Sequence, residues 1–220
     1  PDGSRIAWES HVTGMPNIWT CEADGQNSCP LIDPNPESPM RFQSVMRGEQ
    51  GVFQFQEGSI GSVFADHSMY LWDPVWSPDG RHIAAGALHT ASGETVALLA
   101  ADGSSLVQLI YGIVGVANVI WSPDGTQLAG TLRTAPQETE RSGIFVVKAD
   151  GADTYRWLID VTLQGPRLGG AKRPGMMSWY SHGSAQPRRV LKTFTSLAWS
   201  PDGGRLAFSA DLDPSGSFDV

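Results

Sequence analysis

Short segments of alternating apolar and polar residues recur along the chain, and each one is bounded by a turn sequence. Four of them, SRIAWES, RHIAAGAL, TQLAGTL and GRLAFSA, have the period of two that is typical of β-strands. Each of the first three is followed by a second segment (NIWTCEADG, TVALLAADG, GIFVVKADG) and a third (SCPLID, SLVQLIYG, YRWLIDV). A fourth segment runs into a tryptophan, as in GVANVIWS and FTSLAWS. The pattern predicts an all-β protein built from repeated groups of four antiparallel strands.

The turn that opens each group is WSPDG at residues 76–80, 121–125 and 199–203, and the chain itself begins with PDG. Proline presets φ at the second turn position, aspartate suits the third, and glycine accepts the left-handed conformation that closes the hairpin. We therefore expect these glycines to serve the backbone rather than to cradle a ligand. Each tryptophan is expected to pack one sheet against the next; the alternative is a sugar-stacking platform. The predicted structural repeat residues are Trp76, Pro78, Asp79, Gly80, Trp121, Pro123, Asp124, Gly125, Trp199, Pro201, Asp202 and Gly203.

Four antiparallel strands in radial repetition form the blade of a β-propeller. The segments VWSPDGRHIAAG and TVALLAADGSSLVQLI resemble the WD-repeat-like blades of the TolB propeller family. They are also similar to propeller blades of prolyl oligopeptidase-type serine peptidases. We expect a single β-propeller domain over residues 1–220, with motif-bearing blades at 1–33, 71–111, 116–160 and 194–220.

Spacing leaves two alternatives for the rest of the chain. The turn prolines stand at positions 1, 78, 123 and 201, so two of the three intervals are much longer than the middle one. Residues 34–70 and 161–193 are either insertions or degenerate blades without the turn signature. GVFQFQEGS and GMMSWYSHGS lie where a degenerate blade would carry its second strand, which favours the second alternative. The expectation is then about six units, with incomplete first and last blades, in a fragment of a longer chain.

The two cysteines, Cys21 and Cys29, flank EADGQNS symmetrically about Gly25. In a hairpin centred on Gly25 they face each other across two strands, so a disulfide is expected, and with it an oxidising compartment. The alternative is a pair of buried thiols. Two cysteines without nearby histidines fall short of a zinc site.

The net charge of −8 argues against nucleic-acid binding. One segment is nevertheless basic without any acidic residue, and it forms either a patch for an anionic partner, peripheral to a membrane, or an ordinary solvated face. No run of 18 apolar residues occurs, which excludes a transmembrane helix from the sequence. The residues of this basic segment are Arg167, Lys172, Arg173, Arg188, Arg189 and Lys192.

No catalytic motif is present: the sequence has no Gly-x-Ser-x-Gly elbow, no His-Glu-x-x-His and no phosphate-binding loop. We therefore expect no enzyme activity and no cofactor. A weak calcium candidate is DLDPSGSFD, with oxygen ligands at spacings that begin a calcium loop; an ordinary polar hairpin is the alternative. A sugar- or metal-binding enzyme would need acids and histidines from several blades at one channel mouth. The calcium candidate is Asp211, Asp213, Ser215 and Asp219, and the channel candidates are Asp66, His67, His89 and His182.

Two functions follow from these resemblances. The resemblance to TolB implies a non-catalytic scaffold that binds a protein partner in the periplasm or outside the bacterial cell. The resemblance to peptidase propellers implies a domain that restricts substrate access to a catalytic domain outside these 220 residues.

Overall fold

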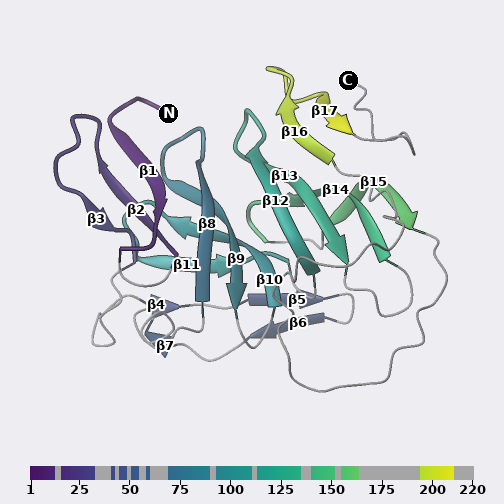
Figure 1. Cartoon of the computed structure of the whole chain (residues 1–220), viewed down its shortest axis with the longest axis horizontal. Helices are drawn as coiled ribbons and strands as arrows, with labels where there is room; N and C mark the ends of the chain where they lie inside the picture. Colours follow the sequence, from purple (N-terminus) through teal and green to yellow (C-terminus); the bar gives the residue numbers. More distant parts are fainter. Residues whose placement is uncertain are drawn as a thin grey trace, which may run out of the picture.

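The computed structural model describes residues 1–12, 16–32, 41–42, 45–48, 51–54, 58–59, 69–89, 93–110, 113–134, 140–151, 155–163 and 194–210. All regular secondary structure within these ranges is β-strand, as the alternation predicted (Figure 1). No helix in the described ranges has the length and apolar character needed to cross a membrane.

Two groups of four antiparallel strands form the centre of the fold as two blades, which one residue pair, Glu94 with Ile113, joins into a continuous sheet (Figure 1). The first consists of β8 (Met69–Trp76), β9 (His82–His89), β10 (Gly93–Ala100) and β11 (Ser105–Gln108). The second consists of β12 (Ile113–Trp121), β13 (Gln127–Thr134), β14 (Glu140–Lys148) and β15 (Arg156–Leu163). Each strand pairs with the one before it, because the turns between them are short. The predicted fold class, all-β with four-stranded antiparallel propeller blades, is confirmed.

A partial blade flanks this pair on each side. On one side β1 (Arg5–Ser10), β2 (Asn17–Glu22) and β3 (Cys29–Pro30) form a three-stranded antiparallel sheet. On the other side β16 (Phe194–Trp199) pairs with β17 (Leu206–Ala210). We refer to β1–β3, β8–β11, β12–β15 and β16–β17 as the first, second, third and fourth units.

The four units are direct neighbours in space. One apolar cluster joins Ile18 and Leu31 of the first unit to Leu71 and Ile83 of the second. A second cluster joins the second unit to the third, and a third cluster places Phe194 of the fourth unit against the third. Burial of these apolar faces between blades is what makes the repeat stable.

This packing bears on the two long intervals of the sequence. A hidden blade between the first and second units would separate them, yet β1 and β2 contact β8 directly. The described strands of the first interval are instead small and peripheral: β4 (Arg41–Phe42) pairs with the edge strand β11, and β7 (Gly58–Ser59) pairs with β4. Strands β5 (Val45–Gly48) and β6 (Gly51–Gln54) form a hairpin of their own.

Among the described residues, the strands of the first long interval do not form a further four-stranded blade. The described residues show four units in direct succession, and the described part of GVFQFQEGS supplies β6 to a hairpin with β5 and β7 to a pair with β4. The fourth unit likewise contacts β12 and β13 of the third without a blade between them. Residues 164–193 lie outside the described ranges.

Each strand that leads into a WSPDG turn carries a bulge three residues before its tryptophan. Asp73, Asn118 and Ser196 have φ of 51°, 53° and 52°, and the pairing register shifts at each position. A bulge increases the local twist of a strand and re-aims its side chains. All three side chains are exposed, so every bulge presents a polar group to solvent.

Candidate functional site

The four PDG turns lie along one edge of the molecule, which we call the turn rim: residues 1–3, 77–80, 122–125 and 200–203. In the third unit, Ser122 Oγ lies 2.6 Å from Asp124 Oδ1, to which it donates a hydrogen bond, and accepts one from the N–H of Gln127 at 2.9 Å. Asp124 Oδ1 also accepts the N–H of Thr126 at 3.0 Å. The second and fourth units repeat these bonds, with Ser77, Asp79, Arg81 and His82 in one and Ser200, Asp202, Gly204 and Arg205 in the other.

The turn glycines adopt the predicted conformation. Gly80, Gly125 and Gly203 have φ of 70°, 72° and 70°, in the left-handed region that disfavours residues with a Cβ. Each donates its N–H to the carbonyl of the serine three residues earlier. At these three positions glycine therefore closes the turn through its backbone.

The turn aspartates are ionised at neutral pH. The pKa of Asp79, Asp124 and Asp202 is lowered, first by the hydrogen bond from the serine hydroxyl two residues earlier and then by the backbone N–H two residues later. The pKa of Asp2 is lowered by the N–H and then the hydroxyl of Ser4. All four side chains are exposed, so each unit contributes one carboxylate to the rim.

Successive turns touch each other. A Cβ placed on Gly80 would lie 3.8 Å from the Pro1 ring, one on Gly125 would lie 3.6 Å from Pro78 Cδ, and one on Gly203 would lie 3.7 Å from Pro123 Cδ. The proline of each turn therefore lies next to the glycine of the following turn, within van der Waals reach of a Cβ at that position. Because neighbouring turns are adjacent, the rim carries one turn carboxylate from each blade.

Two of the three turn tryptophans, Trp76 and Trp121, pack between blades. Trp121 is 9% exposed and belongs to the cluster between the second and third units. Its Nε1–H donates to the carbonyl of Val75 in the preceding unit at 3.1 Å. Trp76 packs against the cluster between the first and second units. This interior position argues against a sugar-stacking platform, because the faces of Trp121 are covered by protein.

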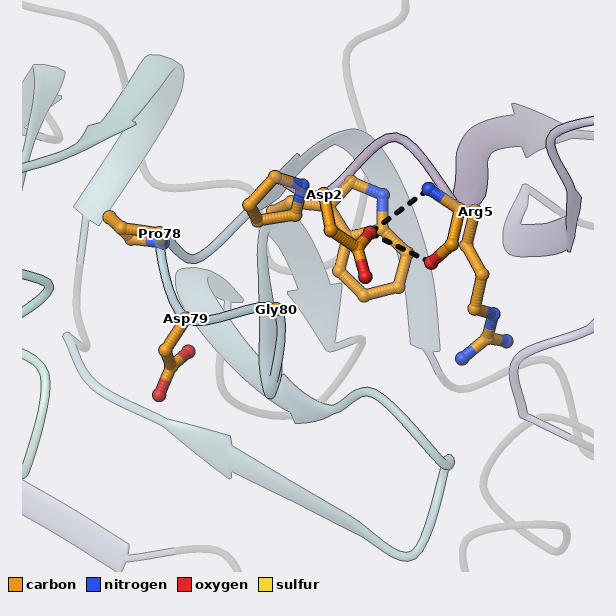
Figure 2. Close-up of a pocket in the computed structure, with 8 residues that line it drawn as sticks. Asp2, Arg5, Pro78, Asp79 and Gly80 are labelled. Atoms are coloured by element: carbon orange, nitrogen blue, oxygen red, sulfur yellow. Dashed lines mark hydrogen bonds between the residues drawn. The ribbon is translucent and has the colours of Figure 1, made fainter.

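A hollow of about 380 Å³ lies on the rim between the first and second units (Figure 2). Asp2 and Arg5 line one side, and Pro78 and Gly80 line the other. The guanidinium of Arg5 lies 5.6 Å from the Trp76 ring centroid, a cation–π distance. Arg5 also donates to Ala101 O at 3.0 Å and to Thr20 Oγ1 at 2.8 Å, and so links the two units.

A second hollow, of about 470 Å³, adjoins the first through Ser4 and Arg5 and contains both cysteines. Here the predicted disulfide is wrong: Cys21 and Cys29 are free thiols, and Cys29 pairs with Thr20 rather than with Cys21. The hairpin register differs by one residue from the predicted one, so the two side chains lie on opposite faces of the sheet. Cys21 is buried and Cys29 is exposed.

The remaining candidates do not form a site among the described residues. His11 is exposed and pairs with Glu9 at 2.9 Å, and no group of three or more potential metal ligands occurs in the described ranges. His82 lies at the start of β9 and His89 at its end, so these two histidines are a strand length apart. The other predicted residues lie outside the described ranges: Asp66, His67, His182, the basic segment (Arg167, Lys172, Arg173, Arg188, Arg189, Lys192) and the calcium candidate (Asp211, Asp213, Ser215, Asp219).

Two repeated features were missed at the sequence level. The serine of SPDG makes the bonds that hold both the aspartate and the returning strand, and its identity in all three complete copies of the turn was the available signal. The bulge residues Asp73, Asn118 and Ser196 share no residue type, so only the register reveals them.

The chain was compared with family models, with curated proteins and with solved structures. No family model matches the chain. An uncharacterized peptidase, YuxL, from Bacillus subtilis is 26% identical over 147 residues, which cover 64% of this chain and 22% of that protein. The match thus spans about a fifth of the relative's length.

Solved structures that this chain matches include a putative TolB from Agrobacterium tumefaciens, with 19% identity and a TM-score of 0.38 over 74% of this chain and 63% of that one. An oligogalacturonate lyase from Vibrio parahaemolyticus has 12% identity and a TM-score of 0.45 over 95% and 56% of the two chains. A puromycin-hydrolyzing peptidase from Mycobacterium tuberculosis has 14% identity and a TM-score of 0.43 over 96% and 35%.

Proposed function

We propose that this chain is a non-catalytic β-propeller module that binds a protein partner through its turn rim. The observation that carries the proposal is that each turn proline lies next to the glycine of the following turn, so that one ionised, exposed carboxylate per unit stands along one edge. A rigid row of charges loses little conformational entropy on binding and favours a partner with a basic surface.

The proposed location is the periplasm or the outside of a bacterial cell. It rests on the resemblance of the WSPDG units to TolB blades, since both cysteines are free thiols and supply no argument from oxidation. The partner is a protein, and we propose no catalytic role for these 220 residues.

Site-specific photo-cross-linking tests the rim. A benzoylphenylalanine at position 81, where Arg81 is exposed beside the second turn, is compared with one at position 12, where Val12 is 81% exposed beyond the other end of β1. We expect a partner cross-link from position 81 that weakens as salt is raised, because screening reduces charge attraction. Equal cross-linking from both positions, or none from position 81, would overturn the proposal.

The match to a peptidase supports a second candidate, a propeller domain that restricts access to a serine peptidase active site located elsewhere in the polypeptide. Labelling the native protein with a fluorophosphonate, which reacts with activated serines, distinguishes the two candidates. A labelled serine on the polypeptide that contains this sequence supports the peptidase domain. An unlabelled polypeptide with a rim cross-link supports the scaffold.

A further inference from the structure

Asp-Gly pairs stand at the tips of two kinds of turn: the SPDG turn of the rim, and the ADG turn between β2 and β3, β10 and β11, and β14 and β15. In both kinds the glycine has a positive φ and donates its N–H to the carbonyl of the residue three positions earlier. The two turns therefore share this backbone hydrogen bond, and the side chains around the aspartate are what differ. The aspartates are Asp79, Asp124 and Asp202 in SPDG, and Asp24, Asp102 and Asp150 in ADG.

An Asp-Gly pair is a dipeptide that can rearrange without an enzyme. The glycine nitrogen attacks Cγ of the aspartate, a C–N bond forms, the carboxyl group loses its hydroxyl as water, and a five-membered succinimide results. Water then adds to either ring carbonyl, which gives back aspartate or gives isoaspartate, in which the main chain runs through the side-chain methylene. Glycine favours ring closure because it has no side chain to hinder the attack. The carboxyl group must be protonated to lose water, and it must be free to turn toward the glycine nitrogen.

The SPDG turn opposes both requirements. In the third unit Asp124 Oδ1 accepts the hydroxyl of Ser122 at 2.6 Å and the N–H of Thr126 at 3.0 Å, so the carboxylate is held from two sides. The hydroxyl bond is also the main cause of the lowered pKa of Asp124, which keeps the carboxyl group ionised. Ring closure with Gly125 requires these bonds to break. The second and fourth units have the same serine and the same bonds.

The turn of Asp24 has no such hydroxyl. Gly25 N–H donates to the carbonyl of Glu22 at 2.9 Å, so Glu22 occupies the serine position of the SPDG turn. Its carboxylate accepts Asn27 Nδ2–H at 3.0 Å and has no proton to donate to Asp24. Asp24 Oδ1 accepts the N–H of Gln26 at 2.9 Å, and Asp24 and Gly25 are both exposed. Within the described ranges the Asp24 carboxylate therefore has a backbone donor but no hydroxyl donor.

The ADG turn of the second unit is different. Its serine position is Ala100, but the hydroxyl and the N–H of Ser104 both bind the Asp102 carboxylate and lower its pKa. The first ADG turn has Gln26 at the place of Ser104. A hydroxyl on either side of the tip thus distinguishes Asp102 and the SPDG aspartates from Asp24.

We propose that Asp24 is a site of spontaneous isomerisation, through a succinimide with Gly25, and that the serine of SPDG protects the rim aspartates from the same reaction. A hydrogen bond to a charged group that must break before ring closure slows the reaction about tenfold or more. At the tip between β2 and β3 isomerisation adds a methylene to the main chain, whereas in the SPDG turns the serine keeps each carboxylate in its place on the rim. The inference holds whether or not the rim binds a partner.

Ageing of the purified chain tests the site. The chain is kept at mildly acidic pH and body temperature for several weeks, and isoaspartate in each proteolytic peptide is quantified by methylation with an isoaspartyl methyltransferase and located by mass spectrometry. We expect isoaspartate to form at Asp24 at least about tenfold faster than at Asp124. The same chain in concentrated urea is the control, because the difference should disappear once the turns are unfolded.

Removing the serine should expose a protected site. In Ser122→Ala we expect isomerisation at Asp124 to become about tenfold faster. Asp79 and Asp202 in the same molecule keep their serines and should keep their rates. These two internal controls separate loss of the hydroxyl from a general loss of stability, which would accelerate all three sites together.

Adding a serine should protect the exposed site. Glu22→Ser places a hydroxyl at the serine position of the first ADG turn, and Glu22→Ala is the matched control, since both variants remove the bond to Asn27. We expect Glu22→Ser to slow isomerisation at Asp24 about tenfold relative to Glu22→Ala, with equal urea midpoints as the folding check. No isoaspartate at Asp24, a preference for Asp24 that persists in urea, or equal rates in the two Glu22 variants would each overturn the proposal.

Discussion

Replacing the turn serine tests how much its two hydrogen bonds stabilise the SPDG turn. Ser122 is 1% exposed; its hydroxyl donates to Asp124 and accepts the N–H of Gln127, where β13 begins. Ser122→Ala removes both bonds and adds no atoms, so the effect is not complicated by a new steric clash.

The expected loss in free energy of unfolding depends on which group loses its hydrogen-bond partner when each bond is removed. Gln127 N–H loses its acceptor, and a buried or half-buried N–H without one costs about 1–3 kcal/mol. Asp124 is exposed and keeps the N–H and hydroxyl of Thr126, so water replaces its lost bond at little cost. We therefore expect Ser122→Ala to lower the free energy of unfolding by about 1–2 kcal/mol.

Urea denaturation followed by tryptophan fluorescence measures the change, with Ser105→Ala as the control. Ser105 is an exposed serine at the start of β11, and its removal should cost less than about 0.5 kcal/mol. In the same Ser122→Ala variant, the pKa of Asp124 should rise toward the ordinary aspartate value, because the serine hydroxyl is the main cause of its depression. An unchanged Asp124 pKa together with a loss equal to that of Ser105→Ala would refute the reasoning.

Three further predictions concern packing and pH. Gly143→Ala should lower the free energy of unfolding by at least about 3 kcal/mol, because its Cβ would overlap the backbone carbonyl of Ile159; a urea midpoint equal to that of the wild type would contradict this. Ile83→Ala should cost about 2–5 kcal/mol and Ile6→Ala under about 2 kcal/mol, since only Ile83 is fully buried; equal losses in the two variants would speak against the assigned packing. The four turn aspartates have lowered pKa values in the folded state, below the usual aspartate value of about 4. Their contribution to the free energy of unfolding should therefore be complete at neutral pH and be lost as the pH falls through these pKa values. A urea midpoint that stays constant down to about pH 2 would argue against this linkage.

Local features were predictable because local chemistry determines them. The alternation after each turn gives β9, β13 and β17, and glycine occupies the positive-φ position of each turn because without a Cβ it adopts that conformation at the lowest cost. The interior position of Trp121 also follows, since a large flat side chain at the end of a half-buried strand must be covered by the next blade.

The pairing register of the first hairpin and the spatial order of the units were not predictable from the sequence, because they depend on residues far apart in the chain. Cys21 and Cys29 are symmetric about Gly25 in the sequence, but the hairpin closes with Cys29 opposite Thr20, and one residue of register separates a disulfide from two free thiols. The candidate hollow likewise combines Arg5 with Trp76, and no periodic pattern relates these two positions.

The sequence by itself determined the strands, the turns and the repeated unit, because the period of two and the SPDG turn are encoded within a few residues. Only the tertiary structure decided that the units are consecutive neighbours, that Pro1 lies next to Gly80, and that Arg5 and Trp76 line one hollow. These outcomes depend on which apolar faces bury each other between blades, and that choice minimises exposed surface over the whole molecule rather than within any one segment.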